Sequence, residues 1–236
     1  SSGKSSLLSA LSGIPLPAND KLTTRCPLRL RMEKSDECRA TIGIKWHADS
    51  SYKSDEEYLK HLSVKGKDSS RNHFLKKITE EIVKAQNSII EKCKNEIAQD
   101  VIEVNYYSAD ASDLTLIDLP GIVRVKGKGE SETIVGDIQD LIQSYLINER
   151  CVVLAVVPAN VDFHNSGIMA DAKKYDPETI RTIPVITKPD LIDKGAESSV
   201  LDLLLGKKMD TFQMVQTIYF TWLYFTSLIY LYLWTI

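Results

Sequence analysis

The run CVVLAVVPA at residues 151–159 places the tightest constraint on the fold of this chain. Its residues are apolar or small and several are β-branched, which is typical of a short strand buried on both faces of a parallel sheet. A second run of the same kind, TIPVIT, follows at residues 182–187. A short helix is predicted between the two, near residues 166–175. This succession of buried strand, helix and buried strand is characteristic of the α/β class.

Helical and strand-like segments alternate along the rest of the chain. Helices are predicted after Ser5 up to Gly13 and over about residues 54–62, 69–100, 131–147, 166–175 and 197–205. Strands are predicted over about residues 39–46, 101–108, 113–118, 151–159 and 182–187, with the second and third joined as a hairpin. The helix over 69–100 carries one apolar stripe: Phe74, Ile78, Ile82, Ala85, Ile89, Cys93 and Ile97. We therefore expect an α/β fold with a mostly parallel sheet and helices on both faces.

The charge balance and the cysteine spacing exclude several classes of function. The chain has 29 basic and 32 acidic residues, so it lacks the basic excess of a nucleic-acid-binding surface, and no nucleic acid is expected as a partner. Its four cysteines and four histidines are scattered, with no Cys-x-x-Cys pair, which argues against zinc and disulfides and for reduced thiols. Residues 1–20 show no signal-peptide pattern, and a cytoplasmic location is expected.

The first of three short motifs is SSGKSS at residues 1–6. Gly-Lys-Ser is the end of a phosphate-binding loop, in which backbone N–H groups wrap phosphates at a helix N-terminus. Gly3 would let the backbone approach the ligand, Lys4 would reach the β- and γ-phosphates, and the Ser5 hydroxyl would bind Mg²⁺. Taken alone, the triplet is equally compatible with an exposed terminus.

The second motif, IDLPG at residues 117–121, ends an apolar run in Asp118. The carboxyl end of a strand is where an α/β sheet places its ligands. The Asp118 carboxylate can hold Mg²⁺ through water, and the Gly121 N–H can reach a γ-phosphate. The alternative is an ordinary strand-to-loop turn, since Asp, Pro and Gly all favour turns.

The third motif, ITKPDLID at residues 186–193, follows the second buried run. Asp190 could accept hydrogen bonds from N1–H and the 2-amino group of guanine, a donor pair that adenine lacks. Thr187 precedes Lys188, whose aliphatic stem would lie along the base. Any one motif could be a polar turn. The three together, in this order and after strand-like runs, predict a guanine-nucleotide site.

These stretches resemble the GTPase domain of the dynamin superfamily, with closest similarity to its Mx and dynamin-like branch. The resemblance rests on SSGKSSLLSALSGIPLP, TTRCPL, IDLPGI, AVVPANVDFHNSGIMADAKKYDPE and ITKPDLIDKG, and it runs from Ser1 to about Glu197. It implies a P-loop NTPase fold and attack of water on the γ-phosphate of GTP. It also implies self-association through GTPase domains and association with a membrane or with microtubules.

The resemblance also implies roles for residues outside the three motifs. Thr24 matches a threonine that binds Mg²⁺ and helps to hold the attacking water, and Asp193 matches a carboxylate near the base and ribose. Ser1 matches a loop serine close to the γ-phosphate, where a monovalent cation, Na⁺ or K⁺, neutralises transition-state charge. Ser2 and Ser6 fall within the matched phosphate loop.

Several features depart from the family pattern. The first loop glycine, a water-positioning glutamine and the strand leading into the loop would precede Ser1, so the sheet is expected to lack its first strand. Residues 18–23 lack the glycines that help to bind the monovalent cation, and Pro184 interrupts a run predicted as a buried strand. The pattern stops near Leu205, which predicts an incomplete GTPase domain over residues 1–205 and an apolar tail over 206–236.

The tail leaves three interpretations open. Residues 217–236 carry no charge, and about 20 such residues could span a bilayer as a helix. Tyr and Trp are nevertheless spread throughout instead of gathering at two ends, and the composition favours a strand. The tail is thus sequence foreign to the family, a membrane anchor or a buried core element. The corresponding alternatives to an active GTPase are a GTP- or GDP-binding module with little turnover and an inactive or membrane-associated fragment.

Overall fold

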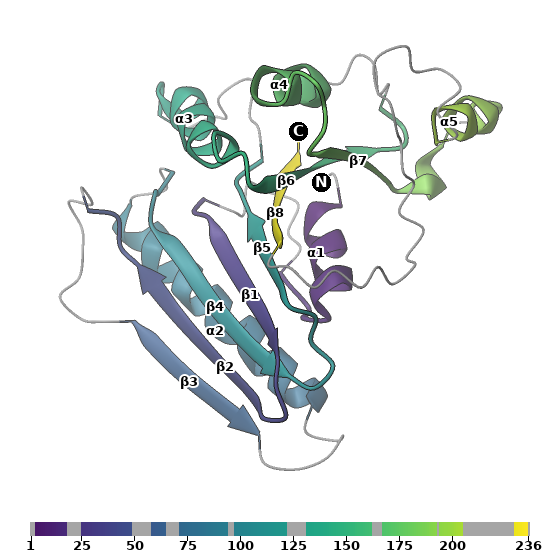
Figure 1. The fold of residues 1–236 in the computed structure, drawn as a ribbon. Coiled ribbons are helices and arrows are strands. Elements are labelled where there is room, and N and C mark those ends of the chain that lie inside the picture. The colour runs from purple at the N-terminus through teal and green to yellow at the C-terminus, as the bar shows by residue number, and fades with distance from the viewer. Residues whose placement is uncertain are drawn as a thin grey trace.

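The computed structural model describes residues 3–17, 25–48, 58–64, 71–93, 97–121, 131–161, 167–192, 194–204 and 229–235. They form one eight-stranded sheet with helices packed against it (Figure 1). The helices are α1 (Lys4–Ser12), α2 (Arg71–Lys92), α3 (Ile134–Leu146), α4 (Gly167–Tyr175) and α5 (Glu197–Leu204), with a 3-10 turn, η1, at Pro189–Leu191. The strands are β1 (Leu28–Lys34), β2 (Cys38–Lys45), β3 (Leu59–Val64), β4 (Val101–Ser108), β5 (Leu114–Asp118), β6 (Cys151–Pro158), β7 (Thr182–Thr187) and β8 (Ile229–Thr235).

The sheet is mixed, and its two halves differ in strand direction. Its order is β3-β2-β4-β1-β5-β8-β6-β7. From β5 to β7 every pair is parallel. In the other half β2 is antiparallel to β3 and β4, and β1 is parallel to β4 but antiparallel to β5. The α/β class is as expected, but the prediction of a mostly parallel sheet holds for one half only.

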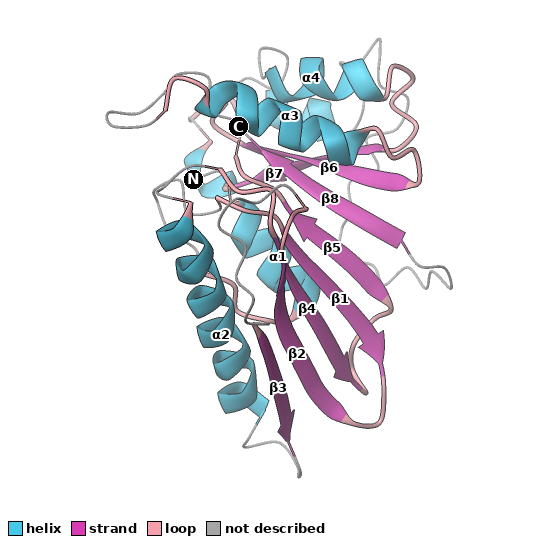
Figure 2. Ribbon diagram, turned by 90° about the vertical axis from the view of Figure 1, so that its left-hand side faces the viewer, coloured by secondary structure: helices cyan, strands magenta, loops and turns pink. Residues whose placement is uncertain are grey.

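Helices cover both faces of the sheet, as the alternation of side chains along β5 and β6 shows. Leu116 and Leu154 pack in a core cluster with residues of α1 and α2. Ile117 and Val153, one residue away on each strand, pack on the other face with residues of α3 and α4 (Figure 2). Since successive residues of a strand point to opposite faces, each of these central strands supplies both cores.

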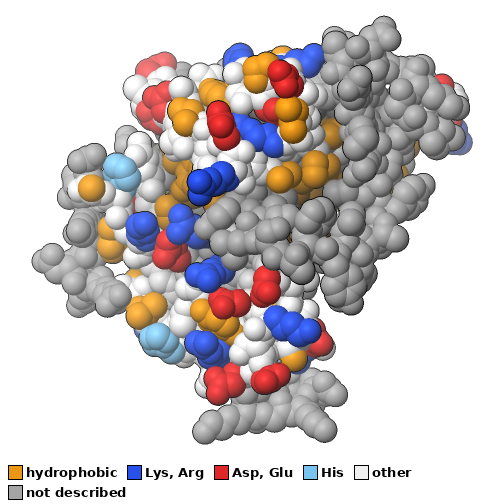
Figure 3. Space-filling model, in the orientation of Figure 1, with side chains coloured by type: hydrophobic (Ala, Val, Ile, Leu, Met, Phe, Trp, Pro, Cys, Tyr) orange, Lys and Arg blue, Asp and Glu red, His pale blue; other side chains and the backbone are white. Residues whose placement is uncertain are grey.

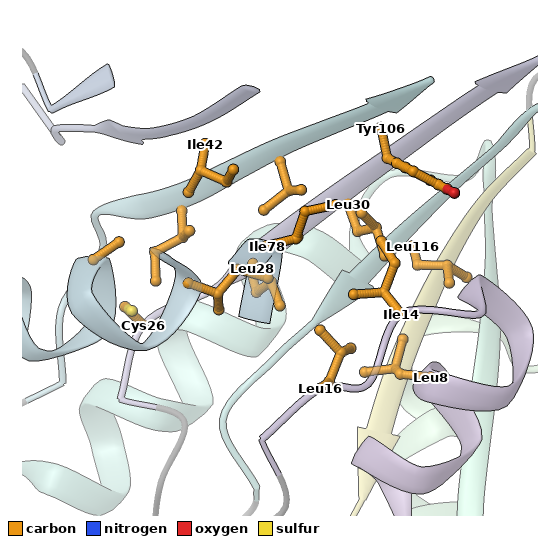
Figure 4. Packing of buried hydrophobic residues seen from close by; sticks show 14 of the residues in the cluster. Leu8, Ile14, Leu16, Cys26, Leu28, Leu30, Ile42, Ile78, Tyr106 and Leu116 are labelled. Atoms are coloured by element: carbon orange, nitrogen blue, oxygen red, sulfur yellow. The ribbon is translucent and has the colours of Figure 1, made fainter. Parts of the chain in front are cut away.

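The larger core joins the first helix to the mixed half of the sheet, which contains β1, β2 and β4. Leu8 on α1 and Ile14 after it lie beside Leu30 and Leu116, and Tyr106 borders the same cluster (Figure 4). The helix ends at Gly13, which has φ 69° and whose N–H donates to the Ser9 carbonyl at 2.9 Å. A glycine in this left-handed conformation is a common helix C-terminus, so the predicted end of α1 is confirmed.

The long helix α2 confirms the predicted stripe but is shorter than expected. Its buried residues include Phe74, Ile78, Ile82, Ala85 and Ile89. It ends at Lys92 instead of continuing to residue 100, and residues 97–100 have no regular secondary structure. Ala98 donates its N–H to the Arg25 carbonyl at 2.8 Å, which ties this segment to the stretch preceding β1.

Two secondary-structure predictions are wrong. Residues 59–62, expected to be the end of a helix over 54–62, belong to strand β3, while 54–57 lie outside the described residues. A capping pattern is a local signal, and pairing of β3 with β2 overrides it. The expected hairpin of β4 and β5 does not form either, because β1 lies between them and pairs with both.

Strand β1 was missed by the sequence analysis although its pattern is present. LRLRMEK alternates apolar and charged residues, and Leu28, Leu30 and Met32 are buried while the residues between them are not. On the polar face, Arg29 forms an ion pair with Glu103 of β4 at 2.8 Å. On the face seen in Figure 3, basic and acidic side chains of the described residues are intermixed.

The two remaining surprises lie at β7 and β8. Among the described strands β7 is at the edge and pairs only with β6, so Pro184 costs no hydrogen bond on its open side. Residues 229–235 of the predicted tail form β8, between β5 and β6. This placement fits the third interpretation of the tail, whereas residues 206–228 and 236 lie outside the described part. None of the described helices has the length and apolarity needed to cross a membrane.

Candidate functional site

The strands that carry the second and third motifs end at one edge of the sheet because they run in the same direction. β5, β6 and β7 are parallel members of one half of the sheet, joined through β8. β5 ends at Asp118 and β7 ends at Thr187. Helix α1 begins at Lys4 and lies against β5 and β8 (Figure 1). The carboxyl edge of such a sheet is the usual place for a ligand.

Lys4 and Asp118 are in direct contact in the interior. The Lys4 Nζ lies 2.8 Å from the Asp118 Oδ1, and the two residues are only 8% and 6% exposed. The same ammonium group donates a hydrogen bond to the Leu119 carbonyl. The Asp118 Oδ1 has no hydrogen-bond partner of good geometry among the described residues, so its contact with Lys4 is an ion pair without an aligned hydrogen bond. The first and second motifs therefore meet as predicted.

Gly3 meets Thr187, and this contact brings the first and third motifs together. Gly3 has φ 84°, a left-handed conformation that favours glycine. A Cβ atom added to Gly3 would lie 3.2 Å from both the Cβ and the Oγ1 of Thr187. Glycine is thus needed here for its backbone conformation and for the close approach of the β7 end.

The turn after β7 presents the third motif at the surface. Lys188 has φ 53° and ψ 55°, which is uncommon for a residue with a side chain and often marks a functional position. The Leu191 N–H donates to the Lys188 carbonyl at 3.0 Å and closes the turn η1. Asp190 is exposed and Lys188 is half-buried. Both are accessible to a ligand at this edge.

The strand ends are held together by main-chain bonds. The Ala159 N–H, just after β6, donates to the Thr187 carbonyl at 2.7 Å, and the Thr187 Oγ1 donates to the Val157 carbonyl at 3.5 Å. These contacts fix the position of Thr187 under Gly3 from the β6 side. The Leu119 carbonyl and this β6 anchor were not expected from the sequence, because main-chain partners leave no mark in residue types.

The other predicted residues fall into two groups. Ser5 and Ser6 lie in the first turn of α1, half-buried and exposed respectively, and Gly121 is half-buried three residues after Asp118. Ser1, Ser2, Thr24 and Asp193 lie outside the described residues, so their roles stay predictions. Within the described part, no group of three or more His, Cys, Asp or Glu side chains could bind a metal by itself.

The segment that follows Thr24 is anchored to the sheet from Arg25 onward. Cys26 is buried, and the N–H of Ile102 donates to the Pro27 carbonyl at 2.9 Å. Burial raises the pKa of the Cys26 thiol, and the nearby Cys93, Asp100 and Asp118 raise this pKa further. Cys26 is therefore a neutral packing residue and not a nucleophile.

Comparison with known proteins identifies the family that this chain resembles. Residues 1–189 match the model of the Dynamin family. The chain is 39% identical over 204 residues to the interferon-induced GTP-binding protein Mx of Dicentrarchus labrax, covering 86% of this chain and 28% of that protein. It is similar to the same extent to the interferon-induced GTP-binding proteins Mx1 of Oncorhynchus mykiss and MxB of Danio rerio, covering 86% of this chain and 30% of each relative. The chain thus spans less than a third of the length of these relatives.

Proposed function

The chain belongs to the dynamin family, and from this premise we propose that it binds GTP and hydrolyses it to GDP and phosphate. The observation that carries the proposal is the meeting of three motifs at one sheet edge. Lys4 contacts Asp118, and Gly3 packs on Thr187, the residue that opens the base-recognition turn. A phosphate group near Lys4 and a base near Asp190 would then belong to one ligand lying along this edge.

The start of α1 would bind the phosphates. The first N–H groups of a helix have no intrahelical partner, and at α1 the earliest helical bond joins the Leu7 N–H to the Gly3 carbonyl. Lys4 would exchange Asp118 for the β- and γ-phosphates, so its charge would remain paired with an anion. Since the positive charge stays compensated at each stage, this exchange avoids leaving a buried charge without a partner.

The residues around Asp118 suit a cation that prefers oxygen ligands. Proteins of this family generally require a divalent metal, and we propose Mg²⁺, held by the Ser5 hydroxyl and, through water, by Asp118. The buried Asp118 carboxylate supports this assignment, because its Oδ1 is paired with Lys4 at 2.8 Å but accepts no hydrogen bond of good geometry among the described residues. The metal would neutralise charge on the phosphate oxygens.

Hydrolysis would proceed by attack of water on the γ-phosphorus, with cleavage of its bond to the β–γ bridging oxygen. Lys4 and the α1 N–H groups would stabilise the charge on the phosphoryl oxygens. The family resemblance adds four further roles to the proposal. Thr24 would bind Mg²⁺, and Gly121 would lie near the γ-phosphate. Ser1 would lie beside a Na⁺ or K⁺ ion, and Asp193 would lie near the ribose. A cytoplasmic location, self-association through GTPase domains, and membrane or microtubule association are proposed on the same basis.

Guanine selectivity tests the proposal directly. We expect fluorescent GTP to bind and to be displaced by unlabelled GTP but not by ATP. Asp190→Asn should weaken GTP binding about 100-fold, because Asp190 would lose a charged pair of hydrogen bonds to the base. Asp36→Asn is the matched control, since Asp36 is an exposed carboxylate in the turn after β1, at the opposite edge of the sheet.

Two outcomes would contradict the proposal in different ways. Equal displacement by ATP and GTP, or an Asp190→Asn variant that binds as tightly as the Asp36→Asn control, would remove the guanine assignment. Binding without phosphate release in a single-turnover assay with Mg²⁺ and K⁺ would leave a nucleotide-binding module that is not an enzyme.

A further inference from the structure

Asp100 is a fully buried carboxylate to which the proposed function gives no role. It is 0% exposed and stands immediately before the start of β4. Its Oδ1 accepts a hydrogen bond from the N–H of His47, just after the end of β2, at 2.7 Å. Burial of a carboxylate is costly, and a hydrogen bond to a carboxylate is stronger than a neutral one. The contact is therefore a firm anchor between the end of β2 and the start of β4.

One row of directly opposed residues leads from this anchor across the sheet to Asp118. Ile44 on β2 lies opposite Ile102 on β4. Ile102 lies opposite Leu28 on β1, which runs between β4 and β5 (Figure 1). Leu28 lies opposite Asp118 on β5. Directly opposed residues share one face of a sheet, and all four are buried, so the row ends with Leu28 beside the Asp118 side chain.

Main-chain hydrogen bonds on both sides of Asp100 hold the stretch that leads into β1. The N–H of Ala98 donates to the Arg25 carbonyl at 2.8 Å, and the N–H of Ile102 donates to the Pro27 carbonyl at 2.9 Å. The two donors lie two residues before and two residues after Asp100. A shift of Asp100 would therefore move the start of β1 with it.

The environment of Cys26 shows that this stretch lies near both carboxylates. Burial raises the pKa of the Cys26 thiol, and the charges of Cys93, Asp100 and Asp118 raise this pKa further. Cys26 itself is buried in the core cluster that also contains Leu28 (Figure 4). The start of β1 thus has Asp100 on its β4 side and Asp118 on its β5 side.

We propose that Asp100 is a positioning residue for Asp118 and acts through the start of β1. The Asp100 carboxylate fixes β4 to the end of β2, β4 holds β1, and β1 holds the end of β5, where Asp118 contacts Lys4 at 2.8 Å. The inference rests on the proposed function for the task of Asp118, which there holds Mg²⁺ through water. Loss of the Asp100 charge would then displace Asp118 and weaken Mg²⁺ binding, although Asp100 does not touch the ligand.

Hydrogen exchange of single amides, followed by NMR on the full chain, tests the placement without nucleotide or metal. Asp100→Asn keeps the shape of the side chain and removes its charge. We expect the His47 amide to exchange at least about 5-fold faster, because its charge-assisted bond becomes a neutral one. The amides of Ile102 and Asp118 should also exchange faster, since β1 is held less firmly. Faster exchange at His47 with an unchanged rate at Asp118 would overturn the proposal.

The Mg²⁺ dependence of GTP hydrolysis tests the functional part. In Asp100→Asn the Mg²⁺ concentration for half-maximal hydrolysis should rise about 10-fold, as is typical when a group behind a metal ligand is changed. GTP affinity measured in EDTA should stay the same, because the variant leaves the start of α1 and the base-recognition turn unchanged. A merely structural role would weaken GTP binding with and without Mg²⁺ alike, so this result would also contradict the proposal.

Two other carboxylates that accept main-chain N–H groups provide matched controls. Asp113 accepts the Lys34 N–H at 2.8 Å at the far end of β1, so Asp113→Asn changes the same kind of bond away from the site. Asp176 is 7% exposed and accepts the Ile180 N–H at 3.1 Å, so Asp176→Asn removes another buried charge. Neither control should alter the Mg²⁺ requirement. If Asp100→Asn alters it no more than Asp176→Asn does, the proposal fails.

Failure of the proposed function would be recognised separately. A parent chain that binds no guanine nucleotide contradicts the proposed function, whatever Asp100 does. If the Asp118 amide of that chain still exchanges faster in Asp100→Asn than in Asp113→Asn, the positioning of Asp118 by Asp100 is supported. If the two variants give equal rates at Asp118, the inference fails as well.

Discussion

Two buried polar clusters at opposite ends of the parallel strands use their hydrogen bonds in different ways. One consists of Asp176 and Arg181, next to the amino end of β7. The other consists of Lys4 and Asp118, at the carboxyl end of β5. Each combines a buried carboxylate with a cation, but only the first is satisfied throughout by its surroundings.

The Asp176–Arg181 cluster ties loops and helix ends together. The Asp176 carboxylate accepts hydrogen bonds from the N–H groups of Ile180 and Arg181, both at 3.1 Å, and from the Thr182 hydroxyl at 2.6 Å. The Arg181 guanidinium donates to the carbonyls of Asn148, Cys151, Leu146 and Tyr175 at distances from 2.6 to 3.3 Å. Every partner belongs to the protein itself.

The Lys4–Asp118 pair is satisfied only in part. Lys4 donates to one carbonyl, and the Asp118 Oδ1 lacks a hydrogen-bond partner among the described residues. The Lys4 ammonium group lies 2.8 Å from this oxygen and compensates its charge, but no hydrogen bond of good geometry reaches the oxygen among the described residues. From this comparison we expect the saturated cluster to serve the fold and the less saturated pair to serve the proposed site.

The largest expected effect is on the saturated cluster. Arg181→Met combined with Asp176→Asn should lower the free energy of unfolding by about 4 kcal/mol, because the carbonyls of the buried Leu146 and Cys151 lose their partner and the buried Asp176 loses its charge. Urea unfolding followed by circular dichroism measures this change. Since the double variant loses much of a typical domain's stability, Arg181→Met alone, with an expected loss of about 2–3 kcal/mol, provides a second measurement.

A loss below about 1 kcal/mol in both variants would show that these bonds contribute little to the fold. The comparison between the clusters would then have no energetic basis.

Removing both charges of the pair at the site should weaken GTP binding and leave the stability of the chain nearly unchanged. Lys4→Met with Asp118→Asn removes both charges of the pair, and replacing both members of a buried ion pair is often neutral for stability. We expect the free energy of unfolding to change by less than about 1 kcal/mol and GTP affinity to fall at least about 100-fold, or about 2.7 kcal/mol.

Guanosine separates the phosphate contribution from the base contribution. Because Lys4 and Asp118 are proposed to act on the phosphate end, affinity for guanosine should be nearly the same in the variant and the parent chain. The double variant Arg181→Met with Asp176→Asn, at the opposite end of the strands, is the control, because it replaces the same kinds of side chain away from the site. If the Lys4→Met/Asp118→Asn variant loses as much stability as this control, then Lys4 and Asp118 serve the stability of the fold.

The sequence predicts the site better than it predicts the sheet, for a physical reason. Gly3, Lys4, Asp118 and Thr187 sit in short motifs whose local conformation depends on neighbouring residues. Their convergence follows from parallel strands sharing one edge, and in the structure Lys4 contacts Asp118 while Gly3 packs on Thr187, a contact that the sequence did not predict. Roles at residues outside the described part stay predictions.

Strand order, by contrast, depends on partners far away in the chain. The insertion of β1 between β4 and β5 pairs residues about 28–34 with two later segments, and no local pattern encodes that choice. For β8 the sequence did indicate strand preference, yet nothing in its composition names β5 and β6 as neighbours. Pro184 carried usable information, since a proline inside a strand predicts the edge position that β7 occupies.

The smallest expected effect concerns the contact between Gly3 and Thr187, which brings the first and third motifs together. Gly3→Ala should cost about 1–2 kcal/mol, because a left-handed φ disfavours a side chain and the new Cβ would press on Thr187. Adding Thr187→Ala to the Gly3→Ala variant should restore the stability that is lost through crowding. It should not restore the stability that is lost through the strained backbone. A double-mutant cycle of urea unfolding would therefore show a coupling of about 0.5 kcal/mol or more between the two positions. Strict additivity would mean that Gly3 and Thr187 do not touch in solution, and the first and third motifs would then be held together only through the sheet.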